Sequence, residues 1–257
     1  MKQGRVILPC AVALTACLLT GCSTLDRIIG ADNWKEWTPT SNTVQVGADG
    51  SVTELLFDTL DQNWYNGNEL QDMIARSMNE YNEQHGAGAI QVTAYSDAGG
   101  NVNVTILYRT PEDYAVFNNV PFESGSMLDA EMAGCLFTGP FSVVEGSSIT
   151  KENVDASEPL SHKEYRVVVS DGTHVVQVPG EIRYVSANGE PVNSHAAQLS
   201  PETGQAESEE GLVLPSEKVW RPEQKEASAK EKDQALLYVI YEKDRETNLF
   251  MTEAPEQ

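Results

Sequence analysis

The chain has 257 residues, of which 39 are acidic and 17 basic, so its formal net charge at pH 7 is −22. A surface this acidic repels nucleic-acid phosphates and anionic lipid head groups, and the composition therefore argues against a nucleic-acid-binding protein. About 40% of the residues are hydrophobic, enough for a chain of this length to bury a core.

The first 22 residues have the pattern of a secretory signal. Lys2 and Arg5 precede an apolar run over residues 6–19, which is too short to favour a membrane-spanning helix. Small residues then lead to Cys22. The four residues Leu19-Thr20-Gly21-Cys22 match the lipobox, Leu-[Ala/Ser/Thr]-[Gly/Ala]-Cys, and here the segment resembles the signal of bacterial lipoproteins.

This resemblance implies a lipid anchor at Cys22. In lipoproteins a diacylglyceryl group is attached to the cysteine thiol and the chain is cut before it, which would remove residues 1–21. Two acyl chains are enough for a stable attachment to a bilayer. Ser23 follows Cys22, so there is no aspartate to suggest retention at an inner membrane. We expect a protein anchored to the cell membrane and facing outside the cytoplasm. An ordinary cleaved signal with a chance cysteine is the alternative.

The mature chain would be more acidic and would lack disulfides. It would carry 15 basic and 39 acidic residues, a formal charge of −24. Cys10 and Cys17 lie in the removed signal and Cys22 is lipidated, which leaves Cys135 without an internal partner. We therefore expect the fold to depend on its hydrophobic core.

Composition divides the remaining chain into a tether and two blocks. Residues 22–42 form the anchor and tether, in which Trp34 and Trp37 either sit at the bilayer interface or, as we favour, pack on the domain edge. Residues 43–145 are predicted to be an α+β block. Residues 146–257 are predicted to be β-rich, with a disordered acidic loop near 198–234 and a closing strand near 236–242. The two blocks form either one domain or two.

In the first block, strands are predicted over residues 43–46 and 52–57. A helix begins near Asn66 and ends at Gly86, with one apolar face made of Leu70, Met73, Ile74, Met78 and Tyr81. A hairpin follows, in which Ile90, Val92 and Ala94 point inward and Val102, Val104, Ile106 and Tyr108 form the same face of the return strand.

Two shorter helices are predicted next. One begins at Pro111 and ends before Pro121, and the other covers residues 126–136. The apolar residues of the second, expected to face inward, are Leu128, Met132, Cys135 and Leu136. The order of elements predicts an α+β fold, with antiparallel sheets built from hairpins and two or three helices packed on one face.

In the second block, residues 165–178 are predicted to form a hairpin around Ser170-Asp171-Gly172. A further strand is expected over residues 181–185. The apolar run at residues 236–241 is the most β-prone in the chain and is predicted to form a central strand.

Catalytic and metal-binding signatures are scarce. Ser148 and Lys151 spell Ser-x-x-Lys, the opening motif of penicillin-recognising enzymes, but its companion motifs are missing and we interpret the match as chance. Cys135 lies on an apolar face, where a core thiol is favoured over a nucleophile. The four histidines, His85, His162, His174 and His195, lack metal-ligand spacing, so neither metal nor cofactor is predicted. The turn residues Asp97, Asp171 and Asn188 need no ligand to explain them.

Aromatic residues give the remaining indication of a binding face, although core positions are the favoured interpretation for them; they are Trp64, Tyr65, Tyr114 and Phe117. Cys22 is thus the one predicted site. We expect a lipid-anchored cell-envelope lipoprotein with a non-catalytic ectodomain that binds a protein or small ligand. The alternatives are an enzyme acting on cell wall or polysaccharide, which needs a carboxylate pair, and the solute-binding component of a transporter.

Overall fold

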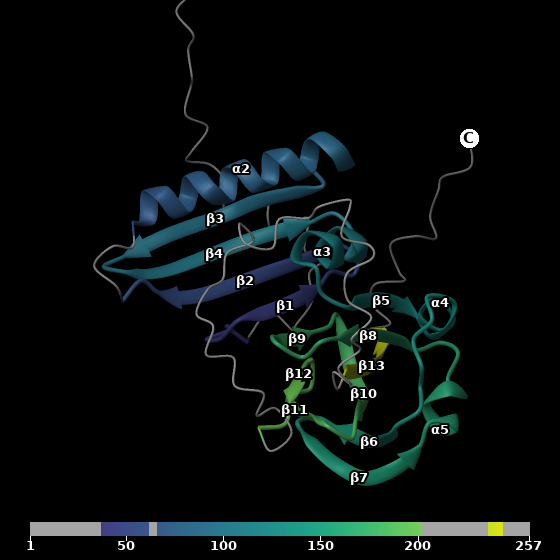
Figure 1. Ribbon diagram of the computed structural model, residues 1–257. Helices are drawn as coiled ribbons and strands as arrows, with labels where there is room; N and C mark the ends of the chain where they lie inside the picture. The colour runs from purple at the N-terminus through teal and green to yellow at the C-terminus, as the bar shows by residue number, and fades with distance from the viewer. Residues whose placement is uncertain (1–36, 62–65, 202–235, 244–257) are drawn as a thin grey trace, which may run out of the picture. The chain divides into compact units, whose positions relative to one another are not determined.

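The computed structural model of the protein describes residues 37–61, 66–201 and 236–243 (Figure 1). These residues form two β-sheets with helices against them, which confirms the predicted α+β class. Within the described residues, no helix combines the length and apolarity needed to cross a bilayer.

The first sheet, sheet A, has seven strands in the order β11-β12-β9-β1-β2-β4-β3. Its neighbouring strands are antiparallel except for β1 and β9, which run parallel. The strands are β1 (Thr43–Val46), β2 (Val52–Thr59), β3 (Ile90–Ala98), β4 (Asn101–Tyr108), β9 (Val175–Gln177), β11 (Gly189–Asn193) and β12 (Ala196–Leu199).

The second sheet, sheet B, is antiparallel and has six strands in the order β5-β8-β13-β10-β6-β7. The apolar run at residues 236–241 lies in β13, between β8 and β10, so the predicted central strand is confirmed. The strands are β5 (Phe122–Ser126), β6 (Pro140–Glu145), β7 (Ser148–Asp155), β8 (Arg166–Ser170), β10 (Gly180–Ser186) and β13 (Leu237–Lys243).

The predicted hairpin over residues 165–178 is wrong. β8 belongs to sheet B, whereas β9 pairs with β1 and β12 in sheet A. The turn from Ser170 to His174 therefore carries the chain from one sheet to the other. Both sheets contain strands from residues 43–145 and from residues 146–257.

The longest helix in the described part of the chain, α2 (Gly67–His85), lies along β3 as Figure 1 shows. Asn66 is its N-cap, with a side chain that accepts a hydrogen bond from the Asn68 amide, and Gly86 ends it with φ of 100°. Leu70, Ile74 and Tyr81 are buried and Met73 and Met78 pack against them, so the predicted apolar face is confirmed.

The β3–β4 hairpin is also confirmed, but the predicted inward orientation of Ala94 in β3 is wrong. A bulge between Val92 and Ala94 shifts the register, so that Tyr95 pairs with Val104 and packs against the core. Ala94, predicted to point inward, is exposed instead. A bulge adds one residue to a strand and reverses the alternation beyond it.

The other helices among the described residues are short: α3 (Pro111–Asn118), α4 (Met127–Met132) and α5 (Ser157–Leu160). α3 begins as predicted, with Thr110 as N-cap and Pro111 in the first turn. The helix predicted over residues 126–136 ends four residues early. A Schellman motif stops it: the Gly134 amide donates to Glu131 O and the Cys135 amide to Ala130 O, with Gly134 at φ of 92°.

Buried side chains form two clusters on the two faces of sheet B. The main core joins sheet A, α2, α3 and one face of sheet B, which supplies Val168, Leu237, Val239 and Tyr241. The small core lies on the opposite face and contains Val167, Val169, Tyr238 and Ile240 with Met127 and Ala130 of α4. Successive residues of β8 and β13 alternate between the cores, as strand geometry requires. Both clusters lie between Val44 and Tyr241, so a chain beginning after Cys22 retains all of their residues.

Candidate functional site

Several residues singled out in the sequence lie outside the described residues. These are the predicted lipidation site Cys22 and three of the aromatic residues, Trp34, Trp64 and Tyr65. Most of the acidic loop predicted at 198–234 also falls there. The anchor therefore stays a prediction.

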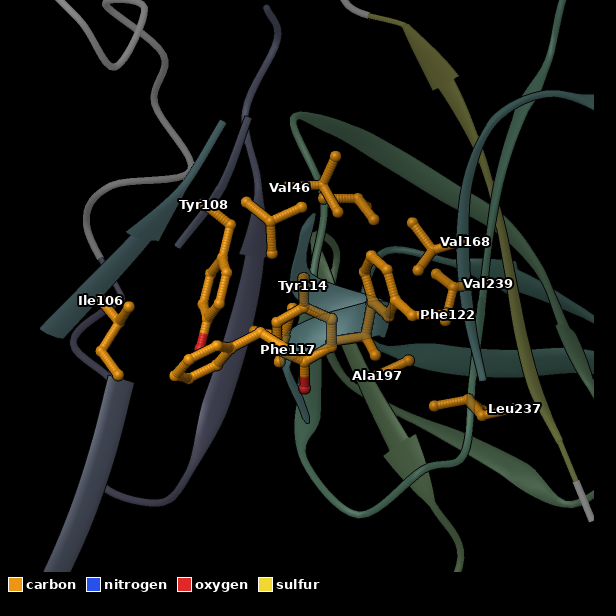
Figure 2. Close-up of a cluster of buried hydrophobic side chains, with 14 of the residues drawn as sticks. Val46, Ile106, Tyr108, Tyr114, Phe117, Phe122, Val168, Ala197, Leu237 and Val239 are labelled. Carbon is orange, nitrogen blue, oxygen red and sulfur yellow. The ribbon is translucent and has the colours of Figure 1, made fainter. Parts of the chain in front are cut away.

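Tyr114 and Phe117 are buried, in agreement with the core interpretation. Their rings fill the space between sheets A and B (Figure 2). The Tyr114 ring meets the Tyr108 ring of sheet A edge-on at 5.1 Å and the Phe122 ring of sheet B at 4.7 Å. Such offset and edge-on pairs add packing energy beyond the area they bury. These aromatics join the two sheets instead of forming an exposed binding face.

Cys135 is half-buried and packs against the small core. Burial, and the Glu123 carboxylate after it, raise the pKa of its thiol, which disfavours the reactive thiolate. Lys151 lies 3.1 Å from the Glu158 carboxylate, so its ammonium is engaged away from a serine hydroxyl. Within the described residues, no cluster of three or more histidine, cysteine, aspartate or glutamate residues is arranged to hold a metal ion.

An unexpected polar group lies in the main core. Glu54, in the middle of β2, is only 3% exposed. Its register partners are Val44 on β1 and Ile106 on β4, both members of the main core. Because residues opposite each other share a face of the sheet, the carboxyl group points into this core.

The Glu54 carboxyl is held from one side by Tyr108, on the neighbouring strand β4. The Tyr108 hydroxyl donates to Glu54 Oε2 over 2.6 Å, and it accepts a hydrogen bond from Asn118 Nδ2 at 3.1 Å. Asn118 closes α3, so strand β2, strand β4 and helix α3 meet in one chain of hydrogen bonds. A buried acid left without such a donor would cost several kcal/mol of stability.

On its other side Glu54 faces the turn that connects the two sheets. His174 Nε2 lies 3.6 Å from Glu54 Oε1 and is buried without a hydrogen-bond partner. The Thr173 hydroxyl donates to Asp171 Oδ1 over 2.9 Å, which leaves its oxygen to accept from His174 Nδ1 at 2.8 Å. The network therefore assigns the hydrogen to Nδ1 and the lone pair to Nε2, aimed at Glu54.

Burial favours the neutral form of both groups. It raises the pKa of Glu54 from its ordinary value of 4.5 to about 7, although the Tyr108 hydrogen bond acts in the opposite direction and Asp171 adds to the rise. Burial likewise lowers the pKa of His174, with Asp171 opposing the change. Burial thus favours a carboxylic acid beside a neutral imidazole over an ion pair at this position.

The acids of this arrangement are withdrawn from the surface. The carboxyl groups of Glu54 and Asp171 are buried, whereas the His174 side chain is 17% exposed and Thr173 lies at the surface. The cluster places the 171–174 turn beside β2, with His174 Nε2 3.6 Å from Glu54 Oε1. We call Glu54, Tyr108, Asn118, Asp171, Thr173 and His174 the buried acid cluster.

Sequence reasoning missed the buried acid cluster. Glu54 lies on the same face of β2 as Val52 and Leu56, which suggests that it is buried. Leu55 and Phe57, however, make the opposite face equally apolar. The local sequence pattern predicts a hairpin strand of one sheet at His174. Nothing local indicates that the 171–174 turn lies against β2.

A second unusual feature lies at α4, where the inward orientation predicted for three apolar residues is wrong. Leu128 is 59% exposed, Met132 79% and Leu136 70%, while the buried side of the helix is formed by Met127 and Ala130. The Schellman motif turns Cys135 back onto Ala130 in the small core, and Leu136 then points outward. We call Leu128, Met132 and Leu136 the α4 apolar face.

No family model, curated protein or solved structure matches this chain. Function is therefore inferred from the residues of this chain alone.

Proposed function

We propose that the protein is a lipid-anchored cell-envelope protein whose ectodomain works through contacts with a partner and not through catalysis. The observation that carries the proposal is the sequence Leu19-Thr20-Gly21-Cys22 after a cationic and apolar segment. The combination is specific because the cysteine must coincide with both the end of the apolar run and the small residues before it.

The fold supports an ectodomain that is stable without disulfides. Of the residues that follow the predicted cleavage point, Cys135 is the one free thiol, and it packs against the small core. Thirty-four side chains in two clusters supply the hydrophobic core instead. Residues 22–42 are predicted to be the anchor and tether that precede β1.

The acid with the most unusual surroundings among the described residues is placed for a structural role. Among the carboxyl groups whose pKa departs clearly from its ordinary value, Glu54 has the largest change. Its side chain is buried in the main core. An enzyme that cleaves a polymer needs two carboxyl groups facing an accessible cleft. The nearby Asp171 is buried as well, and its Oδ1 is engaged by Thr173.

The anchor is tested by Cys22→Ala in the full-length chain, expressed in a bacterium that processes lipoproteins. We expect the wild type in the membrane fraction and release of the domain by detergent but not by high salt. Without the thiol no lipid can be attached, so Cys22→Ala should not be held as a lipoprotein and should lose the mass of the lipid. Cys17→Ala, a matched change inside the signal, should behave as wild type. Equal membrane retention and equal mass of the Cys22→Ala and wild-type proteins would refute the proposal.

A further inference from the structure

The α4 apolar face consists of the three large hydrophobic side chains that are exposed among the described residues. Single exposed apolar residues are ordinary on a protein surface. These three lie within nine consecutive positions, and each has more than half of its surface in contact with water. A concentration of this kind marks an interaction site more often than a chance surface.

The helix brings two of these side chains together. Leu128 and Met132 are four residues apart on α4 and therefore project from the same side, away from the buried Met127 and Ala130. Leu136 follows four residues later, across the Schellman turn, so its Cα lies at most about 15 Å from that of Met132. α4 is thus apolar both toward the small core and toward solvent.

Both ends of this segment are fixed. Ser126 and Asp129 form a reciprocal capping box at the start of α4. After the Schellman turn, the Tyr238 hydroxyl of β13 donates to Leu136 O over 2.9 Å. A surface held in one conformation binds a partner with a smaller loss of conformational entropy.

Two exposed acidic side chains lie close to the segment that carries the face. Glu131 lies on α4 itself and is exposed, and Glu123, on β5, is close enough to Cys135 to raise the pKa of its thiol. The pKa of Glu123 is raised by partial burial and by the Glu112 carboxylate, whereas a dominant neighbouring cation would lower it. Arg166 offsets part of the negative charge, since it acts to lower the pKa of Asp129 after the hydrogen bonds from Ser126.

This charge selects among possible occupants. A second copy of the chain carries the same formal charge of −22 and is repelled, as is an anionic bilayer surface. A polypeptide segment with apolar residues flanked by lysine or arginine complements both the leucine and methionine side chains and the acids beside them. We propose that the α4 apolar face is the docking site for such a basic, apolar segment of a partner protein. This inference rests on the proposal that the ectodomain is an interaction module.

The test uses the chain from Ser23 onward, which retains both cores, and two synthetic helical peptides with leucine at the same positions. One peptide has lysine at its polar positions and the other has glutamate. We expect the lysine peptide to bind and the glutamate peptide to bind at least tenfold more weakly, as measured by titration calorimetry at physiological salt. In the triple variant L128S/M132S/L136S, the dissociation constant for the lysine peptide should rise at least about tenfold, because the apolar contacts are lost.

Charge variants separate docking from general attraction to an acidic protein. Glu123→Gln with Glu131→Gln should weaken binding about three- to tenfold. Glu80→Gln with Glu83→Gln, a matched pair exposed on α2, should leave it unchanged. The inference is overturned if the serine variant binds as wild type, if both glutamine pairs have equal effects, or if the glutamate peptide binds equally well. None of these measurements involves Cys22, so a failed anchor and a failed docking site would be distinguished.

Discussion

The buried acid cluster and the α4 apolar face depart from the usual distribution of residues in opposite directions. In the first, an ionisable carboxyl group lies inside a core of valine, isoleucine and aromatic side chains. In the second, leucine and methionine side chains lie in water although a core is directly behind them. The carboxyl group is compensated by partners within the chain, namely Tyr108 and the 171–174 turn. The apolar face has no comparable compensation among the described residues.

This difference distinguishes a feature that stabilises the fold from a feature that indicates contact with another molecule. A polar group that is satisfied by a hydrogen bond can link neighbouring elements, as Glu54 on β2 is linked to β4 by the Tyr108 hydroxyl. An apolar surface is satisfied only when another molecule covers it. We therefore assign a stabilising role to the buried acid cluster and an intermolecular role to the α4 apolar face.

The largest expected effect distinguishes the two sides of α4. Met127 is fully buried and Met132 is 79% exposed on the same six-residue helix. Met127→Ala should lower the free energy of unfolding by about 3 kcal/mol, because it leaves a cavity in the small core. Met132→Ala should change it by less than about 0.5 kcal/mol. Denaturant unfolding monitored by circular dichroism measures both, and equal losses would show that Met132 is part of the core.

Glu54→Gln tests the buried acid through pH. The folded pKa of Glu54, about 7, exceeds its ordinary value of 4.5, so the native state binds the proton more tightly than the unfolded state. This contribution to stability is complete below pH 4.5 and is lost as pH rises through 7. Relative to Glu54→Gln, the wild type should lose about 3 kcal/mol between pH 4.5 and pH 8.

The comparison with the glutamine variant cancels the titration of other groups, because glutamine still accepts from Tyr108 and offers an N–H to His174. Unfolding free energies of both proteins across this pH range provide the measurement. A difference that does not change with pH would mean that Glu54 titrates as an exposed carboxyl group does.

Tyr108→Phe removes the hydroxyl that donates to Glu54 and should have a smaller effect. Above pH 8, where Glu54 is ionised, we expect a loss of about 2 kcal/mol, because hydrogen bonds to charged groups are the stronger ones. Below pH 5 the loss should fall to about 1 kcal/mol. Tyr95→Phe is the matched control: the Tyr95 hydroxyl donates to Gly67 O, a backbone carbonyl that does not titrate. If the stability loss caused by Tyr108→Phe were as independent of pH as that caused by Tyr95→Phe, the Tyr108 hydroxyl would not be bonded to an acid that ionises in this range.

Elements specified by local patterns could be predicted from the sequence. The spacing of Leu70, Ile74 and Tyr81 identified α2, and Thr110-Pro111 marked the start of α3. The apolar run at residues 236–241 gave a central strand because such a segment cannot stay in water. Each of these inferences uses residues within one turn, one helix face or one strand. The residues that cause the structure are therefore close together in the sequence.

Features that depend on distant pairing could not be predicted in the same way. The Ser170 to His174 turn has the residues of a tight hairpin, yet β9 finds its partner in β1, more than 130 positions earlier. Glu54 is buried because His174 and Tyr108 reach it from other strands, which no spacing reveals. At α4 the error was local: Gly134 supplied the helix stop, but the apolar residues at 135 and 136 suggested that the helix continued.

The central claim, an ectodomain held at the membrane by its first mature residue, is tested most directly by mass spectrometry of the membrane-bound protein. Trypsin cleaves after Arg27, so the mature N-terminal peptide should run from Cys22 to Arg27. We predict that it begins at Cys22 and carries a diacylglyceryl group on the thiol. A mature chain that begins at another residue, or a peptide with an unmodified Cys22 thiol, would contradict the account.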